Sequence, residues 1–210
     1  MAMVKRGDRI MVETKKSLGI GEMVRLGLVL VCYAVASCAV LAIVNTFTAP
    51  KIQENKIKKA SGAMKNVFAE ADDFSPVDET FIASNAAILL SDVYLAKKNG
   101  EVIGAVIQAS GPTYDRAKII VGLNTDFTVS GVQFLENTDS PGFGQKASDP
   151  NFVLPNGKTF YDQFTGKSAE NEFLLNESFD AITGATITSR AVGELVNESC
   201  VALKKVLLDN

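Results

Sequence analysis

The chain has 210 residues, of which 47% are apolar, enough for one folded domain with its own core and one additional element. It contains no His, which excludes His-based acid–base chemistry, a Ser-His-Asp triad, His-ligated haem and most zinc sites. A formal net charge of −3 offers no basic footprint for nucleic acid.

The three cysteines form neither a CxxC pair nor an iron–sulfur spacing. Cys32 and Cys38 lie in an apolar run, where small packing residues are the favoured interpretation. The alternative is a metal centre shared with another membrane subunit. Because the side chains supply no redox centre, any redox function requires a bound cofactor.

A stretch of 24 residues, 26–49, carries no charge and follows a basic N-terminal segment, residues 1–25. As a helix it would be about 36 Å long, and a bilayer core is about 30 Å thick. A buried core helix is disfavoured at this length. A cleaved signal peptide is disfavoured because the run is too long and no convincing small-residue cleavage site follows it. We therefore predict a retained transmembrane helix over 26–49.

The remainder of the chain, residues 50–210, predicts an α+β domain. Residues 50–68 predict a helix with Pro50 near its first turn. Residues 88–96 and 102–109 predict a hairpin with Asn99-Gly100 at its tip, and 118–123 with 128–135 predict a second strand pair. An antiparallel sheet of four or more strands, flanked by helices at both ends of the domain, is the expected architecture.

Residues 136–146 contain Pro141, Gly142 and Gly144 within four positions. Such a turn lets the backbone approach a flat ligand closely, and Phe143 adds an aromatic wall. Spacing alone favours a simple connector between a strand and a helix.

Residues 180–190 crowd four hydroxyl side chains around Gly184-Ala185. Apolar residues at three- and four-residue spacing follow from Val192 to Leu207 and predict a helix. A turn of this kind presents free N–H groups and the positive end of the helix dipole to a phosphate. An ordinary side-chain N-cap is the alternative, and these residues alone favour it.

The order Asp180-x-x-Thr183-Gly184-Ala185-Thr186 resembles the flavinylation motif of the FMN-binding subunits RnfG and NqrC. The resemblance implies FMN bound to Thr186 through a phosphoester, with Thr183 as the second candidate. The stretch 136–146 resembles the family's Glu-Thr-Pro-Gly-Leu-Gly loop beside the flavin ring, with Asp139, Ser140 and Phe143 as replacements. Tyr114 is matched to an aromatic residue near the flavin. The full set of cofactor-binding residues implied in this way is Tyr114, Asp139, Ser140, Pro141, Gly142, Phe143, Gly144, Asp180, Thr183, Gly184, Ala185, Thr186, Thr188 and Ser189.

Residues 44–52 also look like the membrane exit of RnfG proteins, which implies that residues 1–25 are cytoplasmic and 50–210 extracytoplasmic. Charge alone gives only a slight bias, because four lysines follow the span. A Thr hydroxyl needs a base to become a nucleophile, and no His is available. The family therefore implies a separate magnesium-dependent flavin transferase that uses FAD and recognises Asp180 together with the turn.

The function implied by the resemblance is that of the G subunit of an Rnf-type ion-translocating ferredoxin:NAD⁺ oxidoreductase. The protein would pass electrons between membrane-embedded partners, with no turnover alone and no catalytic or metal-ligating side chain of its own. The alternatives are an NqrC-type subunit of a sodium-pumping quinone reductase and a membrane-anchored extracytoplasmic binding domain without cofactor. A free-standing flavin reductase is disfavoured because no nicotinamide fingerprint is present.

Overall fold

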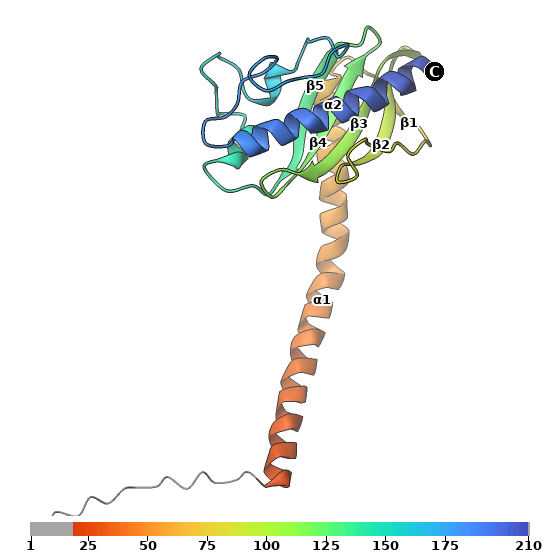
Figure 1. Cartoon of the computed structure of the whole chain (residues 1–210). Helices are drawn as coiled ribbons and strands as arrows, with labels where there is room; N and C mark the ends of the chain where they lie inside the picture. Colours follow the sequence, from red (N-terminus) through yellow and green to blue (C-terminus); the bar gives the residue numbers. More distant parts are fainter. Residues whose placement is uncertain (1–18, 210) are drawn as a thin grey trace, which may run out of the picture. The chain divides into compact units, whose positions relative to one another are not determined.

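The computed structural model describes residues 19–209, so residues 1–18 of the predicted cytoplasmic tail lie outside the described part. The chain divides into two compact units, one ending at Gln53 and the other beginning at Glu54. The second unit contains the five-stranded sheet, the C-terminal helix and the last turns of the N-terminal helix (Figure 1).

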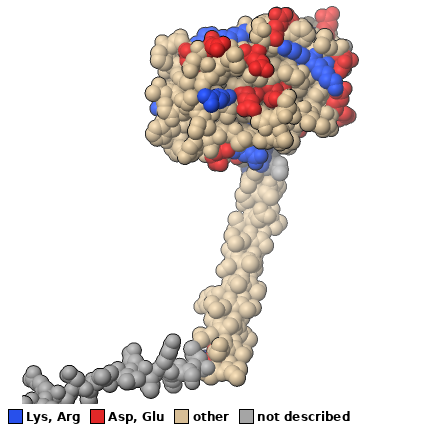
Figure 2. Space-filling view, viewed as in Figure 1, with Lys and Arg blue, Asp and Glu red and all other residues tan. Residues whose placement is uncertain are grey.

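Helix α1 (Ile20–Val67) is continuous through Pro50, whereas the sequence pattern predicts that a separate helix begins there. Proline in a helix interior costs about 3 kcal/mol. Long helical stretches on both sides offset this cost, because each added residue contributes a backbone hydrogen bond cooperatively. Among the described residues, α1 is the one helix long and apolar enough to cross a membrane. Its side chains from 26 to 48 are exposed, and this uncharged stretch forms a continuous tan surface in Figure 2.

The sheet confirms the predicted antiparallel α+β architecture. Its strands lie in sequence order, and each pairs antiparallel with the next. They are β1 (Asp73–Pro76), β2 (Leu89–Lys98), β3 (Glu101–Pro112), β4 (Arg116–Asn124) and β5 (Val129–Asn137). Asn99 and Gly100 join β2 to β3 with φ of +52° and +86°, the positive values that a two-residue type I′ turn requires. Strand β1 has only four residues and carries too short a pattern to be predicted from sequence.

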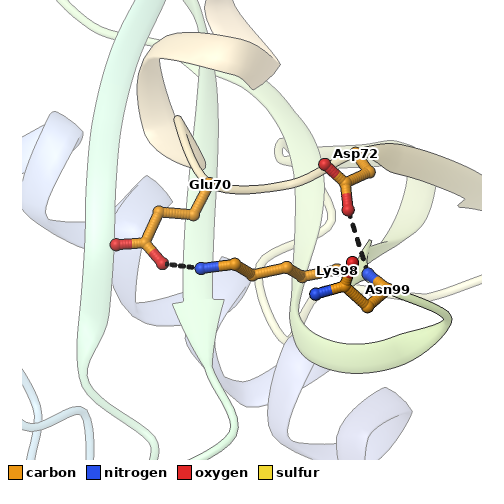
Figure 3. Close-up of polar contacts among 4 residues, drawn as sticks. All are labelled: Glu70, Asp72, Lys98 and Asn99. Carbon is orange, nitrogen blue, oxygen red and sulfur yellow. Dashed lines mark hydrogen bonds and ion pairs between the residues drawn. The ribbon is translucent and has the colours of Figure 1, made fainter.

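The tip of the β2–β3 hairpin is held by the segment that follows α1 (Figure 3). The ammonium of Lys98 lies 2.5 Å from a carboxylate oxygen of Glu70, and the N–H of Asn99 donates to Oδ2 of Asp72 at 2.9 Å. Their mutual hydrogen bond lowers the pKa of Glu70 and raises that of Lys98. Because both charges are in water, the contact fixes geometry more than it adds stability.

The two faces of the sheet are covered separately. Helix α2 (Thr186–Asp209) lies across one face (Figure 1), where it contributes Leu195 and Leu203 to the core beside Ile107 and Ile119. The opposite face buries Val106 and Ile120 against the last turns of α1. This alternation along β3 and β4 is the period-two pattern on which the strand prediction rests.

Between β5 and α2 the chain is irregular, with only two short 3-10 helices, η1 (Gly144–Ser148) and η2 (Tyr161–Gln163). Phenylalanine side chains hold this segment on the core. The ring centroids of Phe160 and Phe164 are 6.0 Å apart, and those of Phe164 and Phe179 are 4.8 Å apart. Phe160 and Phe164 are both fully buried and therefore belong to the core.

Cys200, on the buried face of α2, is expected to be chemically inert in the folded chain. Its residue is only 3% exposed, and burial raises the pKa of the thiol to about 12. Because the thiolate is the nucleophile, iodoacetamide at about pH 8 should leave Cys200 unmodified until the domain is unfolded in urea. Peptide mass spectrometry that separates the Cys200 peptide from those of Cys32 and Cys38 measures this. Rapid alkylation without denaturant would contradict the prediction.

Candidate functional site

A pocket of about 570 Å³ opens where three segments of the second unit meet. They are the loop between β3 and β4, the loop after β5, and the beginning of α2. Cavities of this size are typical of cofactor and small-molecule sites. The lining contains small, hydroxyl, aromatic and aliphatic residues and no charged side chain: Tyr114, Ser140, Pro141, Phe143, Gly144, Gly184, Ala185, Thr186, Ile187 and Thr188.

A tight turn delivers the chain into α2. The N–H of Ala185 donates to the carbonyl of Ile182 at 2.9 Å. Gly184 occupies the third position of this turn with φ of +81°, a value that type II turns require at that position and that favours glycine. Helix α2 then begins at Thr186, six residues before the apolar spacing from which the sequence predicts it.

The first turn of α2 is not capped by a side chain. The carbonyl of Ala185 accepts the first helical hydrogen bond, from the N–H of Ser189 at 2.9 Å, which makes Ala185 the N-cap residue. Alanine has no oxygen with which to cap. Within residues 19–209, the N–H groups of Thr186, Ile187 and Thr188 have no protein acceptor. The side-chain N-cap, which the residues of the turn alone favour, is therefore absent. The beginning of α2 presents free N–H groups and the positive end of the helix dipole to an anion.

The four hydroxyl residues of the turn have different environments. Thr186 is exposed and lines the pocket. Thr188 also lines it, but its hydroxyl is buried and donates to Asp139 at 2.6 Å. Ser189 is fully buried and bonds to backbone groups of the preceding turn. Thr183 is exposed but lies outside the lining. Of the four, only Thr186 combines an exposed side chain with a place in the pocket wall.

Exposed apolar side chains surround the pocket. Tyr114 is 67% exposed, Ile187 62% and Phe143 57%. Phe143 follows Gly142, whose φ is +78°, and its ring lies against Gly184, where a Cβ would approach it to 3.3 Å. A flat ligand could cover these surfaces and remove them from water, a favourable change of about 25 cal/mol per Å².

Five residues of the predicted set lie outside the lining: Asp139, Gly142, Asp180, Thr183 and Ser189. Asp139 is completely buried behind the wall. The carboxylate of Asp180 accepts a hydrogen bond from Nδ2 of Asn156 at 2.8 Å, and Asp180 lines a separate polar pocket of about 190 Å³. The N–H of Asp180 donates to Gln163 at 2.9 Å, so its backbone is fixed while its side chain is exposed.

The polar side chains of the pocket are the hydroxyls of Tyr114, Ser140, Thr186 and Thr188. Its lining has no carboxylate, amine or thiol that could act as a general acid or base. Within the described part of the chain, no three Cys, Asp or Glu side chains are placed to hold a metal ion. The pocket combines free N–H groups that could bind an anion, an exposed hydroxyl at Thr186 and apolar walls.

Sequence reasoning missed three residues around this pocket. Ile187 lies seven positions before Glu194, on the outer face of α2, so the helical period could have identified it as an exposed apolar residue. Thr113 and Asn137 hold the neighbouring loops by hydrogen bonds to and from Asp139. The sequence analysis did not identify them. Thr113 is 26 positions from Asp139, and the bond of Asn137 to the N–H of Asp139 depends on the conformation of this loop.

Comparison with known proteins matches both parts of the chain. Residues 114–200 match the FMN-binding domain family, and residues 17–67 match the RnfG N-terminal region. The FMN-binding match begins at Tyr114 and contains the two loops and the helix start that form the pocket.

Relatives align over nearly the whole chain. The G subunit of the Na⁺-translocating ferredoxin:NAD⁺ oxidoreductase complex of Acetobacterium woodii is 36% identical over 208 residues, covering 89% of this chain and 95% of the relative. The G subunit of the ion-translocating oxidoreductase complex of Aliivibrio fischeri is 31% identical, covering 84% and 88%. The corresponding protein of Methanosarcina acetivorans is 24% identical, covering 85% and 93%. The resemblance drawn from the signature residues is confirmed: this chain belongs to the RnfG family, the G subunits of ion-translocating oxidoreductase complexes.

Proposed function

We propose that this protein is the electron-transferring G subunit of an Rnf-type ion-translocating ferredoxin:NAD⁺ oxidoreductase and carries FMN covalently on Thr186. The other membrane subunits of the complex are its redox partners. Its place in the RnfG family and its match to the FMN-binding domain support the carrier function. The covalent bond rests on one observation: of the four hydroxyl residues in the turn before and within the start of α2, Thr186 is the one that is both exposed and part of the pocket wall.

The residues around the pocket fit FMN. The uncapped N–H groups of Thr186, Ile187 and Thr188 would hold the oxygens of a phosphate diester, which keeps one negative charge after esterification. Tyr114 and Phe143 offer aromatic surface to the ring system. Gly184 has no side chain beyond Cα, so the backbone beside the attachment point can approach the cofactor closely.

Attachment requires a nucleophilic Thr186, and the pocket contains no base to make it one. We therefore assign the proton abstraction to a separate flavin transferase that uses FAD with magnesium. Oγ1 of Thr186 attacks the phosphorus of the FMN half of FAD, the bond to the bridging pyrophosphate oxygen breaks, and AMP leaves. The hydroxyl proton passes to the base of the transferase. Asp180 lies six residues before Thr186. Its side chain is exposed and its backbone N–H is held by Gln163, so that enzyme could recognise it in a fixed position.

FMN supplies the one- and two-electron chemistry that the side chains lack. The chain itself would hold the phosphate at the start of α2 and keep the cofactor from diffusing away. The side chains of Tyr114, Phe143 and Ile187 are exposed, so partner subunits would have access to this side of the domain. Efficient relay between membrane subunits also requires that the carrier stay at the membrane, and the uncharged stretch of α1 is suited to that.

We place the flavin domain outside the cytoplasm, with residues 26–49 as the span and residues 1–25 inside. Retention is the physical reason for a covalent bond in this location. A flavin released from an extracytoplasmic site is lost by dilution, whereas a phosphoester prevents release.

The proposal is tested by expressing the full-length chain with a flavin transferase that is either exported or retained in the cytoplasm. We expect the intact mass of the denatured chain to rise by FMN minus water only with the exported enzyme. Loading only by the cytoplasmic enzyme would contradict the orientation. Unloaded protein in both arms, while a known substrate of the same transferase is loaded, would contradict the covalent carrier.

A further inference from the structure

The carboxylate of Asp139 is completely buried and accepts three hydrogen bonds. Its Oδ1 accepts from the hydroxyl of Thr113 at 2.5 Å and from the N–H of Asp115 at 2.7 Å. Its Oδ2 accepts from the hydroxyl of Thr188 at 2.6 Å. These are short, charge-assisted bonds, the strongest class of hydrogen bond in proteins.

The three donors belong to two of the segments that form the pocket, and Asp139 belongs to the third. Thr113 and Asp115 flank Tyr114 in the loop between β3 and β4. Thr188 lies in the first turn of α2, two residues after Thr186. Asp139 directly precedes the Pro-Gly loop that contributes Ser140, Pro141, Phe143 and Gly144 to the lining. One carboxylate therefore joins all three walls while remaining outside the lining itself.

The packing around this carboxylate is tight on the side of Gly144. A Cβ at Gly144 would lie 2.5 Å from Oδ2 of Asp139 and 2.6 Å from the hydroxyl oxygen of Thr188. Asn137 fixes the loop from its other side: its Oδ1 accepts from the N–H of Asp139 and its Nδ2 donates to the carbonyl of Gly144, both at 3.1 Å. The positions of the loop and of the helix start are thus coupled through atoms in direct contact.

We infer that Asp139 is a positioning residue that sets the separation between the Tyr114 loop and the first turn of α2, acting through Thr188 rather than touching the cofactor. The inference rests on the proposed function in naming flavin as the occupant of the pocket. The coupling between the Tyr114 loop and the first turn of α2 does not depend on which ligand the pocket holds. The side chain of Thr188 then has a role separate from that of its backbone N–H: its hydroxyl, bonded to Asp139, holds Thr186 and its neighbours at a fixed place beside the pocket.

A carboxylate is required at this position because three donors converge on it. Asparagine at 139 would replace one acceptor oxygen by an NH₂ group that faces a donor, leaving a buried polar group without a partner. Glutamate keeps both acceptor oxygens but adds a methylene in a packed site. The hydroxyl of Thr188 can be retained in Thr188→Ser or deleted at almost constant shape in Thr188→Val, which gives a matched pair.

The coupling is tested first on the full-length chain without flavin, by hydrogen exchange at the amide of Asp115. Thr188 makes no hydrogen bond to this amide. The hydroxyl of Thr188 and the N–H of Asp115 both donate to the carboxylate of Asp139, one to each oxygen. We expect Thr188→Val and Asp139→Asn to accelerate exchange at Asp115 about tenfold, the effect of losing one charge-assisted hydrogen bond, and Thr188→Ser to restore protection. If Thr188→Val does not fold, Thr188→Ala, which leaves more room, gives the same comparison.

The control is Ser199→Ala, which removes another buried hydroxyl from the same helix, one that donates to the carbonyl of Leu195 at 2.7 Å. It should leave the exchange of Asp115 unchanged relative to that of neighbouring amides, because Ser199 takes no part in the hydrogen bonds of Asp139. Unchanged Asp115 exchange in Thr188→Val would overturn the coupling. Equal acceleration in Ser199→Ala would also overturn it, because the effect would then be one of stability alone.

The second readout uses the flavin-loaded chain. Thr188→Val and Asp139→Asn should shift the visible circular dichroism bands and the midpoint potential of the bound flavin, whereas Thr188→Ser and Ser199→Ala should match the wild type. Loaded variants with wild-type bands and potential would overturn the positioning role while leaving the proposed function intact. A wild-type chain that takes no flavin would refute the proposed function, and the hydrogen-exchange result would still decide the coupling.

Discussion

The full-length variant Thr186→Val is expected to carry no covalent flavin when it is expressed with an exported flavin transferase. Valine has nearly the shape of threonine but lacks the oxygen that would form the phosphoester. Because the Thr186 side chain is exposed, we expect the stability to change by no more than about 0.5 kcal/mol. Intact mass spectrometry and flavin fluorescence of the denatured chain measure the loading, and the complete loss of the adduct is the expected result.

Two further variants make this result specific. Thr183→Val removes the other exposed hydroxyl of the turn, which lies outside the pocket lining, and should leave loading unchanged. Thr186→Ser keeps a hydroxyl at the same position and should retain measurable loading. If Thr186→Val still carried the adduct and Thr183→Val did not, the attachment point would be Thr183.

The variant Gly122→Ala is expected to destabilise the flavin domain severely. A Cβ at this position of β4 would lie 2.2 Å from Cγ1 of Val67 and 2.8 Å from the ring of Phe68. Both side chains are only 5% exposed, and a β-branched valine in a helix has one strongly preferred rotamer and cannot turn away. Overpacking of this kind costs about 1–3 kcal/mol, and we expect the upper end of that range here. Urea unfolding of the full-length chain in detergent measures it as a lower midpoint.

The matched control is Gly131→Ala on the neighbouring strand, because Gly131 is the register partner of Gly122. The nearest atoms to a Cβ at Gly131 belong to Val67 and lie 3.6 Å away, which is ordinary contact distance. This substitution should be neutral or should stabilise the domain by up to about 1 kcal/mol, since it restricts the unfolded chain. If both variants lost the same free energy of unfolding, the cause would be the replacement of glycine in a strand. Steric contact with Val67 and Phe68 would then not explain why glycine is required at 122.

Much of the fold was readable from local patterns. Period-two alternation with Asn99-Gly100 between two runs predicted the β2–β3 hairpin, because a type I′ turn needs positive φ at both central positions. Apolar spacing from Val192 onward predicted α2. Pro50 was misread as the beginning of a helix, because a local rule about proline does not include the cooperative stability of the helix on both sides.

The sequence by itself determined the presence of the long uncharged stretch, the antiparallel α+β domain, and the Thr-Gly-Ala-Thr turn that opens the last helix. These follow from periodicity, run length and turn chemistry, which act over a few residues at a time. Tertiary structure alone decided which hydroxyl of the turn is exposed in a pocket and which are buried, and it placed Asp139 behind the wall rather than on it. The exposure of a side chain depends on what packs against it from distant segments. Thr188 and Thr186 are alike in sequence, but only Thr188 meets a carboxylate 49 positions away.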